Sequence, residues 1–171
     1  LLESRDERVA ELAGKTFGEA IESTRDSVVA QYRDSVYVGD RNKGQGVFQK
    51  NCVVCHSLDS ETALVGPDLR ALTNRSTAAL LESILDPSRN IESRFASYTF
   101  AMKDGRTLTG VVTAETAGGA KVLDAEGRSH MVRHETVEST ITNPKSIMPD
   151  GFETNITIEQ MSDLLAYLQS M

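Results

Sequence analysis

The chain has 171 residues, of which 39% are apolar and 25% are charged, and its formal net charge is −7. A chain of this length and composition can bury an adequate core, and no run approaches the eighteen apolar residues of a transmembrane helix. The acidic balance disfavours nucleic acid and anionic membrane surfaces, and it either favours a partner with a basic contact patch or only keeps the domain soluble.

Residues 1–38 carry apolar side chains at steps of three and four, which predicts an amphipathic helix interrupted near Gly14 and Gly18. No signal peptide is visible at the start, so we expect a mature product or, preferably, a piece cut from a longer protein. The helix either packs on the rest of the chain or ends a preceding helical region. We favour the second interpretation, with 1–40 as a helical extension.

The only two cysteines, Cys52 and Cys55, stand three residues apart and are followed directly by His56. Residues 42–52 are predicted to form a short helix that leads into them. Two thiols at this spacing on a helical turn can each add to one vinyl group of a haem, while the histidine reaches the iron from the same face. The string therefore predicts one covalently bound haem c, attached at Cys52 and Cys55, with His56 as an iron ligand.

Three other uses of the cysteine pair stay open. A thioredoxin-like dithiol needs a buried strand before the motif, whereas the approach here is polar apart from Val47 and Phe48. A zinc site could take its other ligands from His130 and His134, although these lie far along the chain. The pair could also be two buried cysteines that stand beside a histidine by coincidence.

The Gly66-Pro67 turn comes about ten residues after the motif. Such a turn can aim a backbone carbonyl at the free Nδ1–H of His56 and fix its tautomer. Pro67 is therefore a candidate cofactor-binding residue. By itself, Gly-Pro indicates only a turn.

In the middle of the sequence, the spacing of apolar residues changes from one typical of a helix to one typical of strands. Ser76 or Thr77 can cap a helix that is stopped by Asp86-Pro87. From about 96 to 135, runs rich in Thr, Val, Tyr and Phe are separated by Asp-Gly, Gly-Gly and Glu-Gly turn signals. This pattern predicts an antiparallel insert of about four short strands.

The second iron ligand is sought among the methionines and the other histidines. Met148 stands in a loop bracketed by Pro144 and Pro149, which can hold a ligand without disturbing a helix. A methionine that only fills a gap, or ligation by His130 or His134, are the alternatives. The remaining methionines occupy predicted strands, the apolar face of the last helix and the chain end: Met102, Met131, Met161 and Met171.

The last segment predicts a helix with a capping box formed by Thr157 and Gln160. Its apolar face should pack against the helix that holds the cysteines. That face consists of Ile158, Met161, Leu164, Leu165 and Leu168.

The sequence resembles a class I cytochrome c over roughly residues 42–171. The resemblance is carried by Cys52-Val53-Val54-Cys55-His56, Gly66-Pro67-Asp68-Leu69, Met148-Pro149 and Leu164-Leu165-Ala166-Tyr167-Leu168. With Ile84-Leu85-Asp86-Pro87-Ser88 and the strand pair around Asp104-Gly105, it is also similar to the haem-binding domains of large planctomycete and verrucomicrobial secreted proteins. Those domains often follow a sugar-dehydrogenase-like propeller and helical repeats.

The resemblance implies that Cys52 and Cys55 bind haem, with His56 as the proximal and Met148 as the distal iron ligand. It implies a mainly α fold: a cytochrome c-like haem domain at 41–171 with a small β insert, after a helical tail at 1–40. We expect an exported, periplasmic electron-transfer module without catalytic residues. It would receive electrons from a partner redox protein or a fused dehydrogenase.

Other functions stay possible at this stage. A haem sensor or small-ligand binder would have an open or displaceable distal position. A peroxidase-like enzyme would need His130 or His134 over the haem, and a haem could also serve only to stabilise the fold. The sequence predicts neither the oligomeric state nor the role of the β insert.

Overall fold

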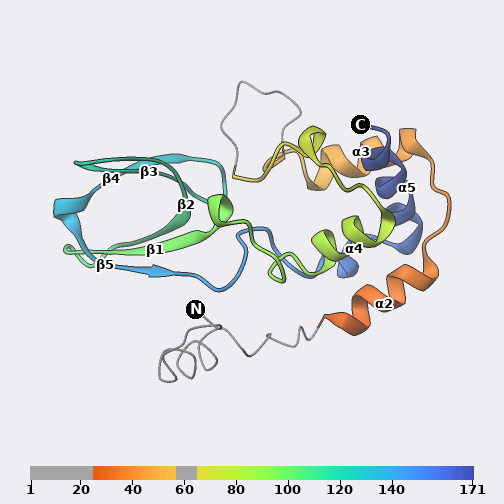
Figure 1. Ribbon diagram of the computed structural model, residues 1–171, viewed down its shortest axis with the longest axis horizontal. Coiled ribbons are helices and arrows are strands. Elements are labelled where there is room, and N and C mark those ends of the chain that lie inside the picture. The colour runs from red at the N-terminus through yellow and green to blue at the C-terminus, as the bar shows by residue number, and fades with distance from the viewer. Residues whose placement is uncertain (1–24, 57–64) are drawn as a thin grey trace, which may run out of the picture.

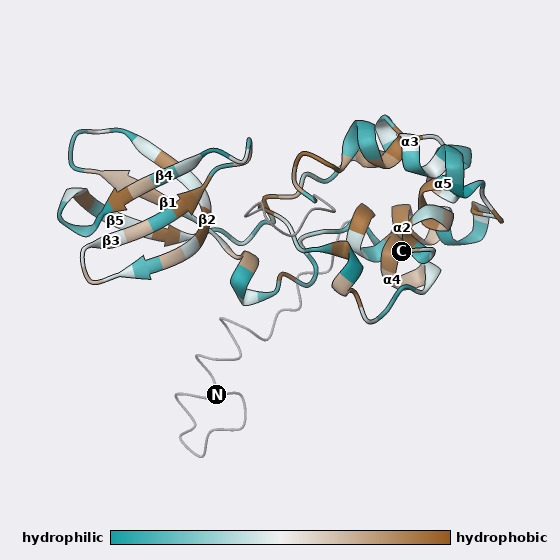
Figure 2. Cartoon of the chain, turned by 90° about the horizontal axis from the view of Figure 1, so that it is seen from above, coloured by the Kyte–Doolittle hydropathy of each residue, from teal (hydrophilic) through white to brown (hydrophobic). Residues whose placement is uncertain are grey.

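The computed structural model describes residues 25–56 and 65–171. α-Helices gather at one end of the molecule, which we call the helical end, and an antiparallel sheet forms the other, the sheet end (Figure 1). Apolar residues occur on the elements of both ends (Figure 2). Residues 1–24 of the predicted N-terminal helix, which include Gly14 and Gly18, lie outside the described residues.

The helical end contains α2 (Asp26–Ser35), α3 (Arg41–Asn51), α4 (Thr77–Leu85) and α5 (Ile158–Gln169). Local capping explains where three of them begin. The Asp40 carboxylate accepts from the first backbone N–H groups of α3, and the Ser76 hydroxyl caps α4. The predicted capping box of Thr157 and Gln160 is confirmed at the start of α5.

Helices α3 and α5 pack closely although they are distant in sequence. A Cβ on Gly44 would lie 1.9 Å from the carbonyl oxygen of Asp163, so only glycine permits this approach. One turn later, the rings of Phe48 and Tyr167 pack with centroids 5.5 Å apart. The expected packing of the last helix against the cysteine-bearing helix is therefore confirmed, and it fixes the end of α3 from which the motif emerges.

Helix α2 docks on the same helical end. Tyr32 is buried, and its hydroxyl donates to the backbone carbonyl of Ile156 at 3.1 Å. Arg25 pairs with Glu153 at 2.5 Å across the same contact. Residues 26–35 thus pack against the domain that comes after them, while the proposed boundary near residue 40 stays a prediction.

The sheet end has the strand order β4-β3-β2-β1-β5, and every neighbouring pair is antiparallel. The strands are β1 (Ser97–Met102), β2 (Thr107–Thr116), β3 (Gly119–Leu123), β4 (Ser129–Arg133) and β5 (Val137–Thr142). Val111 in β2 pairs with Ser97 of β1 on one side and with Leu123 of β3 on the other. One face carries its own buried cluster of Phe100, Ala120, Val122 and Val132.

Two sequence predictions about this region are wrong. The fold is not mainly α, because 39% of the described residues are helical and 23% lie in a five-stranded sheet. The insert also has a fifth strand, which extends it past residue 135. Strand β5 is an edge strand whose side chains are almost all exposed, so it lacks the alternating apolar pattern of a half-buried strand. Backbone pairing with β1 defines it instead.

Candidate functional site

The cysteine motif forms a tight turn directly after α3. The backbone N–H groups of Cys55 and His56 both donate to the carbonyl of Cys52, at 3.1 and 2.9 Å. Both thiols are free of a disulfide. The turn follows the last turn of the helix directly. The two thiols and the imidazole therefore belong to one short, hydrogen-bonded segment.

The orientation of His56 is fixed by the turn at Pro67. Its side chain is buried, and Nδ1 lies 3.0 Å from the Pro67 carbonyl oxygen. A carbonyl only accepts, so Nδ1 carries the proton and Nε2 keeps its lone pair. Burial lowers the pKa of His56, and the bond to Pro67 acts in the opposite direction. A neutral imidazole with a free Nε2 is the form that binds a metal.

Gly66 is a site residue that the sequence analysis treated only as part of a turn. A Cβ at this position would lie 2.5 Å from Cε1 of His56 and 2.8 Å from Nδ1. The Gly66 N–H also donates to the carbonyl of Cys55 at 3.1 Å. The glycine therefore lets the backbone lie against the imidazole ring, and its place directly before Pro67 was the available signal.

The acidity of the thiols distinguishes between two uses of the cysteine pair. Burial, with the neighbouring Cys55 as the second cause, raises the pKa of Cys52 to about 11. Burial also raises the pKa of Cys55. A redox-active dithiol needs a thiolate at neutral pH and therefore a lowered pKa. The raised pKa values of the two thiols therefore do not match the thioredoxin-like interpretation.

Met148 lies half-buried against the core of the helical end, the same core that Cys52 contacts. Its loop, residues 143–152, which we call the Met148 loop, is held at several points. The N–H of Asn143 donates to the Ser97 carbonyl at 2.9 Å, and the N–H of Ser146 donates to the Ser88 hydroxyl at 3.1 Å. The Ser146 hydroxyl in turn accepts from the N–H of Met148 at 3.1 Å.

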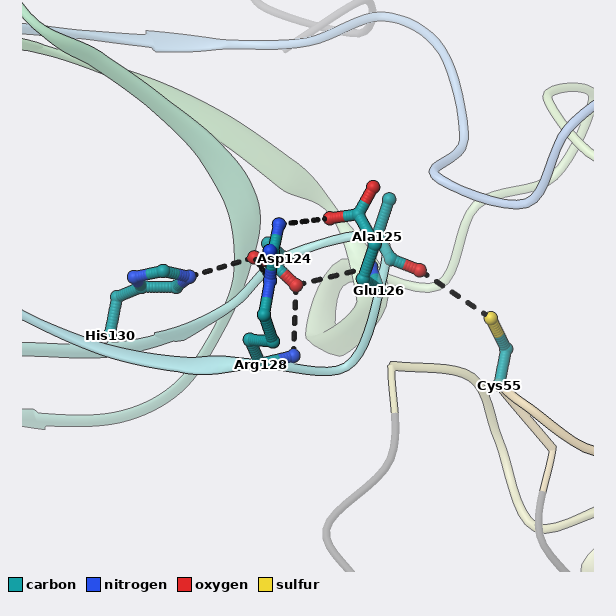
Figure 3. Close-up of polar contacts among 6 residues, drawn as sticks. All are labelled: Cys55, Asp124, Ala125, Glu126, Arg128 and His130. Carbon is teal, nitrogen blue, oxygen red and sulfur yellow. Dashed lines mark hydrogen bonds and ion pairs between the residues drawn. The ribbon is translucent and has the colours of Figure 1, made fainter.

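The other candidate ligands have different surroundings. His130 binds Asp124 through Nε2 at 2.7 Å, and in Figure 3 it lies on the side of Asp124 away from Cys55. His134 lies 3.6 Å from Glu115. Within residues 25–56 and 65–171, no three His, Cys, Asp or Glu side chains gather as a metal site. Of the other methionines, Met161 is buried in α5, Met131 is exposed on β4 and Met102 packs in the sheet cluster.

The sheet end reaches the cysteine motif through the turn between β3 and β4. The carbonyl oxygen of Ala125 lies 3.9 Å from Sγ of Cys55 (Figure 3). Nearby, Val65 packs with Val111 and Leu123 of the sheet, and with Ile147 of the Met148 loop. The sequence predicted the turn but not this contact, because the two partners lie far apart in the chain.

Residues 42–126 match the model of the family described as Cytochrome c, which supports a c-type cytochrome domain in this part of the chain. Domains of this family bind covalently attached haem c with its iron, and the match supports a haem-binding electron-transfer protein. No curated protein matches the chain significantly. The narrower resemblance to large secreted dehydrogenase-like proteins has no support from these comparisons.

The residues present fit haem c. The paired free thiols precede a buried imidazole whose Nδ1 is already occupied, and the glycine that this imidazole requires is in place. The match begins in α3 and ends in the β3–β4 turn, so it includes the cysteine motif and Pro67 but stops before Met148.

Proposed function

We propose that this domain transfers electrons through a haem c attached to Cys52 and Cys55, with His56 and Met148 as the two iron ligands. The observation that carries the proposal is the hydrogen bond between Nδ1 of His56 and the Pro67 carbonyl, which leaves Nε2 as the metal-binding nitrogen. Bound haem c supplies a one-electron couple, and Met ligation raises its potential relative to ligation by two histidines.

The anchoring of Met148 favours an electron carrier over a ligand sensor. Its loop is tied to Ser97 at the start of β1 and to Ser88 after α4, and Ile147 packs against the cluster of Val65, Val111 and Leu123. A sensor needs a distal ligand that leaves easily, whereas a carrier benefits from a ligand that stays in place in both oxidation states. These anchors, at Asn143, Ser146 and Ile147, lie just before the ligand in the chain and support the second behaviour.

The partner and the location are further parts of the proposal. The net charge of −7 supports a redox partner with a basic contact face. A partner or fused dehydrogenase as electron donor is supported only by the sequence resemblance, as is the helical extension at 1–40. Covalent haem attachment supports an exported, periplasmic location. In the described part of the chain, no helix has the length and apolar character to cross a membrane.

The substitution Met148→Ala tests the distal ligand. The oxidised wild-type protein should show the weak absorption of Met–Fe(III) ligation at about 695 nm, and its reduced form should bind CO poorly. Met148→Ala should lose this band, bind CO readily and have a lower midpoint potential. Met131→Ala is the matched control, because Met131 is exposed on β4 and should change none of these properties.

An unchanged spectrum and potential in Met148→Ala would make the distal assignment untenable. Ready CO binding by the wild-type protein would instead favour a sensor with a displaceable ligand. Attachment itself is tested by a pyridine haemochrome assay together with the intact mass. A mass that lacks the haem would refute the central proposal.

A further inference from the structure

The β3–β4 turn, residues 124–128, is the part of the sheet end that lies against the cysteine motif. The Ala125 carbonyl oxygen is 3.9 Å from Sγ of Cys55 (Figure 3). Once haem is attached, this sulfur is a thioether and donates no hydrogen bond. In the haem-loaded protein this distance would therefore describe position only, with the Ala125 carbonyl beside the sulfur through which Cys55 would hold the haem.

This turn is held by one carboxylate. Asp124 accepts from Nε2 of His130 at 2.7 Å and from Nε of Arg128 at 2.9 Å. It also accepts from the backbone N–H groups of Arg128 and Glu126, at 2.8 and 3.1 Å. Gly127, with φ +76°, closes the turn in the left-handed region. Four donors on a single side chain leave the turn little freedom to move.

The ionisation of Asp124 suits its role of holding the β3–β4 turn. Burial acts to raise its pKa, but the hydrogen bonds from His130 and Arg128 hold the pKa well below its usual value. The carboxylate is therefore ionised at neutral pH and accepts all four hydrogen bonds in its charged form, which strengthens them.

A second turn in the same sheet provides an internal comparison. In the β1–β2 turn, Asp104 accepts from the backbone N–H and from Nε of Arg106, and Gly105 has φ +85°. This turn lies at the far end of the sheet (Figure 1), and the Asp104 side chain is 54% exposed. The Asp124 side chain is only 8% exposed. A hairpin turn can therefore close with fewer hydrogen bonds to its aspartate, and with a more exposed aspartate, than the β3–β4 turn has.

We propose that the β3–β4 turn is a water-excluding cover over the Cys55 edge of the haem, and that Asp124 is the positioning residue that holds it closed. The proposal rests on the attachment of haem at Cys55 proposed above. Water at a haem edge stabilises the more highly charged oxidised state, so a cover that excludes water raises the midpoint potential. The apolar contact of Val65 with Val111 and Leu123 keeps the sheet end in place beside this edge.

The test compares Asp124→Ala with Asp104→Ala in the purified haem-loaded protein. Solvent exposure of the Cys55 thioether is measured by nuclear magnetic resonance, as the relaxation that an inert gadolinium chelate induces in its protons. Asp124→Ala should increase this relaxation several-fold and lower the midpoint potential. Asp104→Ala should change neither, because its turn lies away from the haem. Asp124→Asn keeps the shape and one acceptor, so it should give an intermediate result even if Asp124→Ala fails to fold.

The cover is refuted if the Asp124 variants leave both readouts at their wild-type values, if the potential rises, or if Asp104→Ala has the same effect. Wild-type protein that carries no haem in the haemochrome assay would refute the proposed function instead. A fully haem-loaded protein with unresponsive Asp124 variants would refute only the cover.

Discussion

The helical end and the sheet end differ in the contacts that stabilise each of them, because these contacts join residues at different separations along the sequence. In the helical end, α3 packs on α5 although most of the chain separates the two helices in sequence. Helix α2 docks on the segment before α5. In the sheet end, three of the four strand pairings connect strands that are consecutive in the chain, and only β5 returns over a distance to β1. Neighbouring sequence therefore specifies most of the sheet, whereas the helical end depends on elements that lie far apart.

The largest predicted loss of stability distinguishes the helical end from the sheet end. Phe48 is buried between α3 and α5, so Phe48→Ala should lower the free energy of unfolding by about 3–5 kcal/mol and disturb the haem spectrum. Val122 is buried in the sheet cluster, so Val122→Ala should cost about 2 kcal/mol and leave the haem spectrum intact. Denaturant unfolding, followed by haem absorbance and by circular dichroism, measures both. A haem spectrum disturbed equally by both substitutions would erase the distinction between the ends.

Two glycines of α3 sharpen the comparison within the helical end. Gly44→Ala places a methyl group against the backbone of α5 and should cost about 3 kcal/mol. Gly46, two residues later, has no neighbouring atom within 4 Å of its ideal Cβ position. Gly46→Ala should therefore stabilise the protein by roughly 0.5–1 kcal/mol, because alanine favours a helix. Thermal unfolding measures both, and effects of the same sign would contradict the observed helix packing.

Local signals in the sequence predicted the parts of the fold that local interactions determine. The Thr157–Gln160 capping box and the turns at Gly105 and Gly127 occur as the sequence indicated, and of the two predicted caps, Ser76 and Thr77, the structure shows Ser76. Strand β5 was missed because its exposed residues carry no alternating pattern, and only its pairing with β1 defines it. This missed strand also contributed to the wrong expectation of a mainly α fold.

For the candidate site, the sequence indicated the turn at Pro67 and its contact with His56, since the two lie close along the chain. It did not indicate that Ala125 lies beside Cys55. That contact depends on the path of β2 and β3, which bring the turn back to the helical end, and no short pattern encodes such a path. The roles of the site residues in binding haem stay predictions.

The smallest predicted effect concerns the docking of α2. Tyr32→Phe removes the hydrogen bond to the Ile156 carbonyl and should cost about 1 kcal/mol at neutral pH. Burial, followed by the charge of Glu153, raises the pKa of Tyr32 above its ordinary value of 10.0. A raised pKa means that the neutral phenol stabilises the fold fully below pH 10 and that this contribution is lost as the pH rises further.

The difference in unfolding free energy between wild type and Tyr32→Phe should therefore shrink above pH 10. Urea unfolding at neutral pH and at pH values above 10 measures this change. A difference that stays constant with pH would mean that α2 docks without help from the Tyr32 hydroxyl.

The closure of α3 by α5 also sets an order of events while the chain is being made. The cysteine motif precedes Tyr167 by more than a hundred residues, so during synthesis and the proposed export it emerges before Tyr167 can pack on Phe48. In the finished fold, Cys52 is half-buried and its pKa is raised to about 11. Both thiols are more accessible on the incomplete chain than on the folded one. Topology thus favours haem attachment, which we have proposed at these thiols, before the last helix packs on α3.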